Sequence, residues 1–321
     1  MVHELEVASD IARQAGAIVL RHYQAGARAD AYKDGEPVTA ADRDSDAFIV
    51  RALRRAFPDD EVVSEESVER IAAHRGGLSR GGSPDEGSAP TRAPGASEAA
   101  DEAQLVGGED GPFFQLEHTP DAEPPSIEHA PPRTWYVDPM DGTSDFVQRT
   151  GDFVVMIGLA VSGWPVLGVV YHPPSETLYR GGHGLTPEKL VGDQRTELRV
   201  TDVSDPAAAR LVVSRSHTPD AVAGLAARLG INGMEKCGSV GLKAARVAEG
   251  AGELYVHPSA GTKLWDTCAP EAILVAAGGT FSDCDGKPLV YDPRRYHNER
   301  GVLASNGRLH DRVVAELAGG W

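Results

Sequence analysis

The sequence predicts an α/β protein made of two layered subdomains. Its 321 residues are 41% apolar, which is enough for one large core or two smaller ones. Between about residues 134 and 184, apolar stretches separated by Gly and Pro signals are typical of antiparallel strands. Beyond that point strand-like and helix-like patterns alternate, which is typical of α/β structure. We therefore predict an N-terminal α+β subdomain over 1–184 and a C-terminal α/β subdomain over 185–321.

The N-terminal subdomain is expected to begin with two amphipathic helices. Apolar residues recur at helical spacing over about residues 3–25. A similar pattern runs from Asp42 to Phe57, and Pro58 ends it because proline cannot continue a helix. The stretch EVVSEE that follows predicts a short strand.

A long insertion separates this strand from the rest of the subdomain. From about residue 68 to residue 132 the chain is dominated by Gly, Pro, Ser, Ala and acidic residues. Such a composition buries too little apolar surface to offset the entropy of ordering the chain. We expect a mostly disordered surface loop, in which only LVGGEDGPFFQLEH has the pattern of a small hairpin.

The remaining elements follow in a regular order. Antiparallel strands are predicted for TWYVD, DFVVMIGLAVSG, WPVLGVVYHP and TLYRGG. After the boundary, strands are predicted for RLVVSRS, GELYVHP and GTFSD. Helices are predicted for PDAVAGLAARLG, VGLKAARVAEG and WDTCAPEAILVAAGG. No internal repeat accompanies this order.

Net charge and cysteine content indicate which kinds of binding partner and which cellular compartment to expect. The net charge of −17 argues against a nucleic acid polymer, because phosphate contacts need clustered Lys and Arg. A small anionic substrate can still bind if metal ions carry the local positive charge. Three cysteines without a CxxC pair, no signal-peptide pattern and no run of about 18 apolar residues predict a cytoplasmic protein with no membrane partner.

The stretch DPMDGT places two carboxylates directly after the apolar strand TWYV. Burial of an unpaired carboxylate is costly, so a neutralising cation or donor is expected nearby. A single carboxylate at a strand end is more often a helix cap or a solvated turn. Here Pro139 stiffens the turn so that Asp138 and Asp141 can converge, and Gly142 permits a close approach of the backbone.

Further acidic stretches contain Asp42, the pair Glu65 and Glu66, and Asp266. Oxygen ligands without His or Cys suit a hard cation such as Mg²⁺. Two such ions about 4 Å apart would polarise a phosphoryl group and lower the pKa of a bound water. Residues 142–144 are expected to open a helix whose free N–H groups can hold a phosphate. Together these features predict hydrolysis of a phosphate ester.

The motifs WYVDPMDGTSDF and LWDTCAPEAILVAAGG resemble the two signatures of the inositol monophosphatase superfamily. VVSEES and VTAADRD match its other two acidic motifs, and the four occur in the expected order. PVTAADRDSD, GWPVLGVVYHP, VVSRSH and TKLWDTCAPE are most similar to the 3'(2'),5'-bisphosphate nucleotidases within it. The resemblance implies a layered α-β-α-β-α sandwich and a homodimer, which is common in such families.

The resemblance also assigns roles to individual residues. It implies two or three Mg²⁺ ions, held by the Met140 carbonyl and by four side chains: Glu65, Asp138, Asp141 and Asp266. Asp42 and Thr143 would activate the attacking water, and Glu66 would assist behind the metal ligands. The substrate side would comprise Gly142, Thr143, Ser144, Ser214, His217, Ser239 and Lys243. Without the resemblance, Lys243 and His217 would read equally well as a surface lysine and a structural histidine.

The implied reaction is removal of the 3'-phosphate from 3'-phosphoadenosine 5'-phosphate, or from its sulfated form, with sensitivity to lithium. One departure concerns Ser144 and Asp145, which stand after DGT where the nucleotidases usually have Lys and Glu and the inositol monophosphatases Thr and Asn. An inositol phosphate or a sugar bisphosphate is therefore the alternative substrate. A non-catalytic metal and nucleotide sensor is the alternative class, although a sensor has no need of the Asp42 and Thr143 pair.

Overall fold

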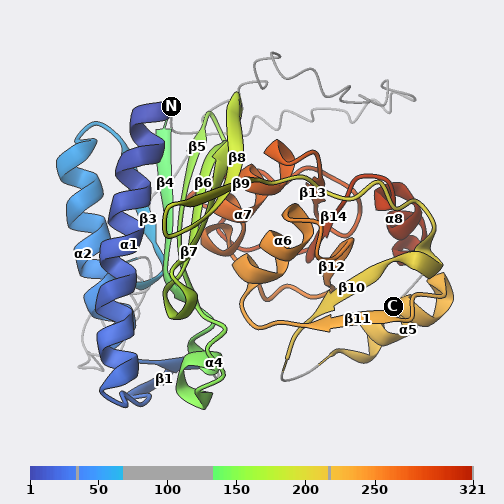
Figure 1. The fold of residues 1–321 in the computed structure, drawn as a ribbon, viewed down its shortest axis with the longest axis horizontal. Helices are drawn as coiled ribbons and strands as arrows, with labels where there is room; N and C mark the ends of the chain where they lie inside the picture. The colour runs from blue at the N-terminus through green and yellow to red at the C-terminus, as the bar shows by residue number, and fades with distance from the viewer. Residues whose placement is uncertain (34–35, 68–132, 216–217, 320–321) are drawn as a thin grey trace, which may run out of the picture.

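The computed structural model describes residues 1–33, 36–67, 133–215 and 218–319. The predicted insertion over about 68–132 lies outside these residues, and so does His217. Figure 1 shows the chain arranged in successive layers of helix and sheet.

Five layers build the molecule. Helices α1 (Val2–Gln24) and α2 (Ala40–Ala56) cover one face of a seven-stranded sheet, and α6 (Val240–Ala248) and α7 (Leu264–Ala276) cover its other face. A five-stranded sheet follows in Figure 1, with two further helices beyond it, α5 (Asp220–Leu229) and α8 (His310–Ala318). This arrangement confirms the α-β-α-β-α sandwich.

The first sheet has the strand order β3-β4-β5-β6-β7-β8-β9. All neighbouring strands are antiparallel except β3 and β4, which are parallel. The strands are β3 (Glu61–Ser64), β4 (Arg133–Asp141), β5 (Val154–Val161), β6 (Trp164–His172), β7 (Thr177–Gly182), β8 (Leu185–Val191) and β9 (Gln194–Glu197). The pairing places β8 and β9 in this sheet, so the sheet extends past the boundary drawn at residue 184. The division into subdomains itself stays a prediction.

The second sheet has the order β11-β10-β12-β14-β13 and mixes parallel and antiparallel pairs. Its strands are β10 (Arg210–Val213), β11 (Gly233–Lys236), β12 (Leu254–His257), β13 (Thr280–Ser282) and β14 (Val302–Ser305). A two-stranded hairpin, β1 (Ala31–Lys33) with β2 (Glu36–Val38), and the short helix α4 (Thr143–Gln148) complete the main elements. The sequence patterns missed β11, β14, α8 and the hairpin, because short segments of mixed polarity carry little periodicity.

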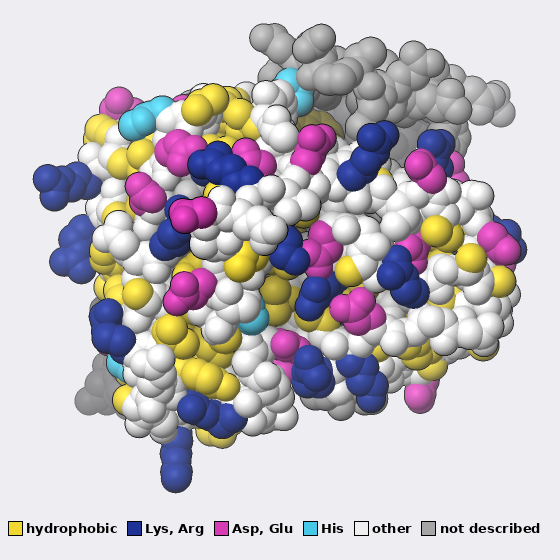
Figure 2. All heavy atoms as spheres, viewed as in Figure 1, with side chains coloured by type: hydrophobic (Ala, Val, Ile, Leu, Met, Phe, Trp, Pro, Cys, Tyr) yellow, Lys and Arg dark blue, Asp and Glu magenta, His cyan; other side chains and the backbone are white. Residues whose placement is uncertain are grey.

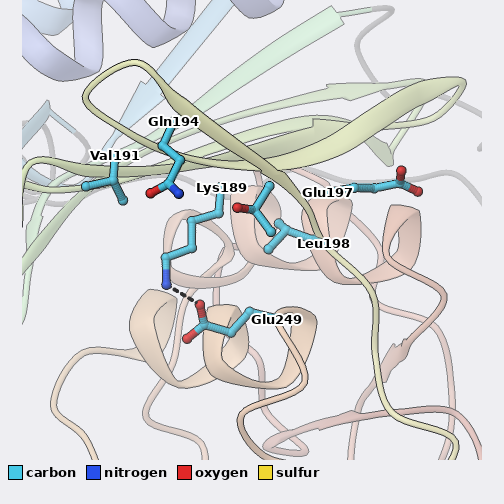
Figure 3. A pocket seen from close by; sticks show the side chains of 7 residues that line it. Lys189, Val191, Gln194, Glu197, Leu198 and Glu249 are labelled. Atoms are coloured by element: carbon cyan, nitrogen blue, oxygen red, sulfur yellow. Dashed lines mark hydrogen bonds and ion pairs between the residues drawn. The ribbon is translucent and has the colours of Figure 1, made fainter.

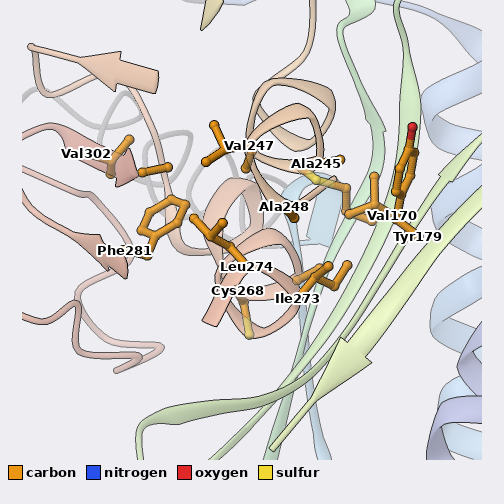
Figure 4. Packing of buried hydrophobic residues seen from close by; sticks show 14 of the residues in the cluster. Val170, Tyr179, Ala245, Val247, Ala248, Cys268, Ile273, Leu274, Phe281 and Val302 are labelled. Carbon is orange, nitrogen blue, oxygen red and sulfur yellow. The ribbon is translucent and has the colours of Figure 1, made fainter. Parts of the chain in front are cut away.

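Helix α7 packs between the two sheets and fills the centre of the molecule. Its apolar side chains meet those of α6, β6, β7 and the second sheet in one buried cluster (Figure 4). Two strand glycines let the helix approach the first sheet closely: a Cβ built on Gly168 would lie 2.0 Å from the Ala269 carbonyl oxygen, and one on Gly158 would lie 2.6 Å from the Ala269 nitrogen. The helix backbone therefore rests almost directly on β5 and β6.

The face of the molecule shown in Figure 2 carries charges of both signs. Figure 2 shows Lys and Arg interspersed with Asp and Glu over the face that it presents. Among the helices that the structure describes, none has both the length and the apolar character needed to cross a bilayer.

We expect Gly168→Ala to lower the free energy of unfolding by about 3 kcal/mol or more, because the new methyl group would collide with backbone that no side-chain rotation relieves. Urea unfolding at 25 °C measures the change. The matched control is Gly224→Ala inside α5, where the nearest atom to the new Cβ is 3.5 Å away. There we expect a gain of about 0.5–1 kcal/mol from the reduced entropy of the unfolded chain. Equal unfolding midpoints for Gly168→Ala and the wild type would contradict the close packing of α7.

Candidate metal and phosphate site

Two carboxylates of the site come from the end of β4, where the strand is irregular. Asp138 pairs with Met156 of β5 and Asp141 pairs with Val154, so β4 has one residue more than its partner over this stretch. Residues three apart in a regular strand point to opposite faces, and the extra residue of this bulge returns them to one face. In agreement, the charge of Asp141 helps to raise the pKa of Asp138, behind burial and the charge of Glu65.

Glu65 directly follows β3, and the parallel pairing of β3 with β4 brings it next to Asp138. Burial raises the pKa of Glu65 well above its usual value. The charge of Asp266 is the next cause, and Glu66 contributes in the same direction, while Lys263 opposes them. Glu65 thus lies within electrostatic reach of Asp138 on β4, and Glu66 within reach of Glu65.

Asp266 and Asp42 reach the site from the first turns of two helices. Asp266 Oδ2 accepts the Lys263 N–H at 2.8 Å at the start of α7, and Asp42 Oδ2 accepts the Thr39 N–H at 2.8 Å at the start of α2. Both are therefore N3 residues that accept the N–H of the N-cap residue, so each has the helix-start role that a lone aspartate often takes. The charges of both also raise the pKa of Glu65, so capping does not remove them from the cluster.

Asp42 and Thr143 form the hydrogen-bonded pair that the resemblance implies. Thr143 Oγ1 lies 3.0 Å from Asp42 Oδ1 and 3.1 Å from the Met140 carbonyl oxygen. The other oxygen of Asp42 accepts the Thr39 hydroxyl at 2.7 Å. Burial raises the pKa of Asp42, and the hydrogen bonds from Thr39 and Thr143 partly offset this effect. The carboxylate is thus fixed in position and disposed to accept a proton.

The donor set fits a hard divalent cation in its chemistry. Only oxygen ligands converge here, and burial together with mutual repulsion raises the pKa values of Glu65 and Asp138, a cost that a cation would relieve. Burial also raises the pKa of Asp141. Over the described ranges, no group of three or more Asp, Glu, His or Cys side chains is placed so that it could hold a metal ion as the structure stands. Three of the carboxylates instead accept N–H groups, from Met140, Gly241 and Lys263.

The turn before α6 is tied directly to Asp141. The Ser239 hydroxyl donates to Asp141 Oδ2 at 2.5 Å, and the Gly241 N–H donates to the same oxygen at 2.8 Å. Ser239 Oγ also accepts the Leu242 N–H and so caps α6. Ser239 has φ +58°, a backbone conformation that costs energy outside glycine. The structure therefore places Ser239 against a predicted metal ligand.

Lys243, one turn into α6, is a buried cation beside these acids. Its Nζ lies 3.5 Å from the Ser214 hydroxyl and 5.0 Å from the centre of the Tyr255 ring. Burial lowers the pKa of Lys243, and the charge of Asp141 acts against that shift. The structure thus brings together Lys243, Ser214 and Ser239, which the sequence analysis placed on the substrate side.

The residues at the start of α4 differ in how closely they are packed. Gly142 is the N-cap of α4 with φ +96°, and a Cβ there would lie 2.5 Å from the Asp152 carbonyl oxygen. Only glycine fits this close approach. Ser144, the next predicted substrate residue after Thr143, is exposed on the helix.

Sequence reasoning missed Asp152 at this site and included Arg215 only as a member of the stretch SRSH, without naming it as a site residue. Arg215 Nε donates to Asp152 Oδ2 at 2.7 Å, and the Gly238 N–H donates to the same oxygen at 2.8 Å. Their only sequence signals were an aspartate after a turn glycine and an arginine inside SRSH, which many surface positions share. A separate cavity of about 350 Å³ lies between β8, β9 and the end of α6 (Figure 3) and contains none of the predicted site residues.

Comparison with known proteins shows which family the chain resembles. The chain matches the model of the inositol monophosphatase family over residues 2–319. It is 34% identical to the 3'(2'),5'-bisphosphate nucleotidase CysQ of Salmonella typhimurium over 294 residues, 90% of this chain and 94% of that protein. It is 31% identical to CysQ of Escherichia coli K12 over 304 residues, 94% and 99% of the two chains.

Solved structures agree on the fold. An inositol monophosphatase from Anabaena superimposes with a TM-score of 0.66 at 24% identity, over 99% of this chain and 96% of the other. One from Thermotoga maritima has a TM-score of 0.66 at 20% identity, over 99% and 97% of the two chains. At these identities the likeness concerns the fold alone.

The family match and the nucleotidase relatives define the chain as a phosphoric monoester hydrolase. The chain belongs to the inositol monophosphatase family. Enzymes of this family act on small phosphorylated substrates and are generally metal-dependent. The recognition made from the four sequence motifs is thereby confirmed, whereas the roles of individual residues remain predictions.

We expect Asp42→Asn and Thr143→Ala each to lower kcat by about 10²–10³-fold, the scale of a lost proton-transfer group. Because the two side chains share one hydrogen bond, the double variant should be scarcely slower than either single variant. Phosphate release from a phosphate monoester, measured at saturating Mg²⁺, tests both. If the loss in kcat of the double variant equals the product of the two single losses, Asp42 and Thr143 act separately.

Proposed function

We propose that this protein is a Mg²⁺-dependent phosphatase that removes the 3'-phosphate of 3'-phosphoadenosine 5'-phosphate, giving AMP and phosphate. We propose 3'-phosphoadenylyl sulfate, which would give adenylyl sulfate, as a further substrate. The observation that carries the choice is Lys243, a buried ammonium group beside Ser214 that a second phosphate would match. The names and similarity of the CysQ nucleotidases support the same choice.

Mg²⁺ would be held by the Met140 carbonyl and by carboxylates on β4, after β3 and at the start of α7: Glu65, Asp138, Asp141 and Asp266. When bound, it supplies positive charge that polarises the phosphoryl oxygens and favours ionisation of water. We propose two or three ions and inhibition by Li⁺, as the family resemblance implies. Glu66 would support this ligand set from behind.

The protein groups that act on water are Asp42 and Thr143. With its hydrogen directed to Asp42, the Thr143 hydroxyl offers a lone pair that orients a water molecule. The water oxygen bonds to phosphorus as the ester P–O bond breaks, and the water proton passes towards Asp42 through Thr143. The departing ribose 3'-oxygen takes up a proton from solvent and leaves as the 3'-hydroxyl of AMP. Burial raises the pKa of Asp42, which makes this carboxylate a better proton acceptor.

Other substrates of the same chemical class fit the site less well. An inositol monophosphate carries no second phosphate, so the Lys243 ammonium group would stay buried without an anion from the substrate. A sugar bisphosphate would supply that anion and is the closer alternative. The intact pair of Asp42 and Thr143 argues against a non-catalytic sensor. A homodimer stays a prediction.

We expect Asp138→Asn to lower turnover about a thousandfold or more, because it removes a charge from the proposed metal ligands. The Mg²⁺ concentration that gives half-maximal activity should rise as well. The matched control is Asp311→Asn on the exposed first turn of α8, which should titrate with Mg²⁺ like the wild type. Full wild-type activity in excess chelator would refute the metal requirement.

We expect Lys243→Met, which keeps the aliphatic stem, to raise KM for 3'-phosphoadenosine 5'-phosphate by a factor equivalent to about 1–3 kcal/mol. The effect on inositol 1-phosphate should be much smaller, since that ester has no group to meet the ammonium ion. Lys189→Met is the control, because Lys189 pairs with Glu249 in the separate cavity of Figure 3. A wild type that prefers inositol 1-phosphate in kcat/KM would rule out the nucleotidase assignment and leave the phosphatase assignment intact.

A further inference from the structure

Asp152 joins three segments that lie far apart in the sequence. It stands between α4 and β5, and its Oδ2 accepts the Gly238 N–H at 2.8 Å from the turn before α6. The same oxygen accepts Arg215 Nε at 2.7 Å and Nη2 at 2.5 Å, from the loop after β10. Charge-assisted hydrogen bonds of this kind are stronger than neutral ones. One carboxylate therefore holds both loops of the proposed substrate side.

The backbone of Asp152 also touches the phosphate side of the site. A Cβ on Gly142 would lie 2.5 Å from the Asp152 carbonyl oxygen, and a Cβ on Gly238 would lie 2.6 Å from the Asp152 Cβ. Both glycines are thus packed directly against this residue. Asp152 therefore occupies the space between the proposed cradle of the scissile phosphate and the turn that leads to Lys243.

The segment that carries Asp152 is itself held in place. His172 Nε2 donates to the Gly151 carbonyl oxygen at 2.8 Å, and Thr150 Oγ1 donates to Asp145 Oδ1 at 2.6 Å. The Asp152 side chain is 17% exposed, so it is largely removed from competing water. These contacts give Asp152 a defined position from which it can orient the two loops.

Arg215 has the character of a recognition group at the rim of the site. Its side chain is 43% exposed, and within the residues that the structure describes Nη1 makes no hydrogen bond. Its chain neighbour Ser214 lies 3.5 Å from the buried Nζ of Lys243. The buried Lys243 thus contacts Ser214, and the half-exposed Arg215 is the next residue along the chain. A guanidinium group with a free N–H edge suits a phosphate oxygen.

We infer that Arg215 contacts the second phosphate of the substrate and that Asp152 is the residue that positions it. Lys243 forms the inner part of this subsite and Arg215 the outer part. Asp152 sets the spacing between the subsite and Gly142, so it favours substrates whose two phosphates match that spacing. This inference rests on the proposed function, because it assigns the second phosphate of the same substrate.

The test compares kcat/KM for 3'-phosphoadenosine 5'-phosphate with kcat/KM for p-nitrophenyl phosphate. Asp152→Ala and Arg215→Ala should each lower the ratio of the two values by about 10–100-fold, mainly through KM for the bisphosphate. Glu316→Ala is the matched control, because it breaks an exposed pair with Arg228 between α5 and α8 and should keep the wild-type ratio. Equal losses on both substrates would overturn the inference.

The double variant Asp152→Ala with Arg215→Ala decides whether the two residues act together. A positioning role predicts a combined loss close to that of Arg215→Ala alone, and Arg215→Lys should not restore the ratio because an ammonium group lacks the guanidinium fork. If Asp152→Ala fails to fold, the ratio for Arg215→Ala, which changes an exposed side chain, still decides whether Arg215 contacts the second phosphate.

The proposed function and the inference can fail separately. A wild type that prefers a sugar bisphosphate would refute the nucleotidase assignment. The coupling between Asp152 and Arg215, measured on that preferred ester, would still test the positioning role. Independent, multiplicative losses on the best substrate would overturn the inference even if the nucleotidase assignment held.

Discussion

The structure depends on gathering buried carboxylates at one end of the first sheet. Charges of one sign in a buried place repel one another, and the pKa values of Glu65 and Asp138 are raised well above their usual values. The surroundings counter this cost with fixed donors: the Met140 N–H at Asp138, Ser239 and the Gly241 N–H at Asp141. The same arrangement that strains the isolated protein provides an oxygen-rich, negatively charged place for divalent cations. The repulsion among these carboxylates thus bears both on the stability of the fold and on the proposed binding of cations.

Helix α7 connects this constraint to the rest of the fold. Its first turn carries Asp266, and its body lies between the two sheets against Gly158 and Gly168. Because no side chain separates the helix backbone from these strand glycines, the position of the helix along the sheet is closely defined. A carboxylate from the second half of the chain is thereby placed against carboxylates from the first half. The site therefore forms only when both halves are packed together.

In the proposed function, chemistry and selectivity would be carried by different parts of the same site. The pair of Asp42 and Thr143 and the β4 carboxylates belong to the first sheet and the helices packed on it. Lys243 and Ser214 come from the α6 helix and the second sheet. The hydrogen bond from Ser239 to Asp141 links the two parts. A displacement of the turn before α6 would therefore also displace a proposed metal ligand. This arrangement allows related enzymes to share a reaction and differ in substrate.

The sequence by itself determined the order of the main helices and of about half of the strands, the five-layer fold through its family motifs, and the acidic residues proposed for the site. These follow from local periodicity and from short motifs, which depend on neighbouring residues only. The tertiary structure decided the rest. The β4 bulge, the placement of β8 and β9 in the first sheet, and the contact of Asp152 with Arg215, 63 residues away, depend on strand register and loop packing. Such contacts produce no periodic pattern in the sequence, because each partner alone looks like an ordinary surface residue.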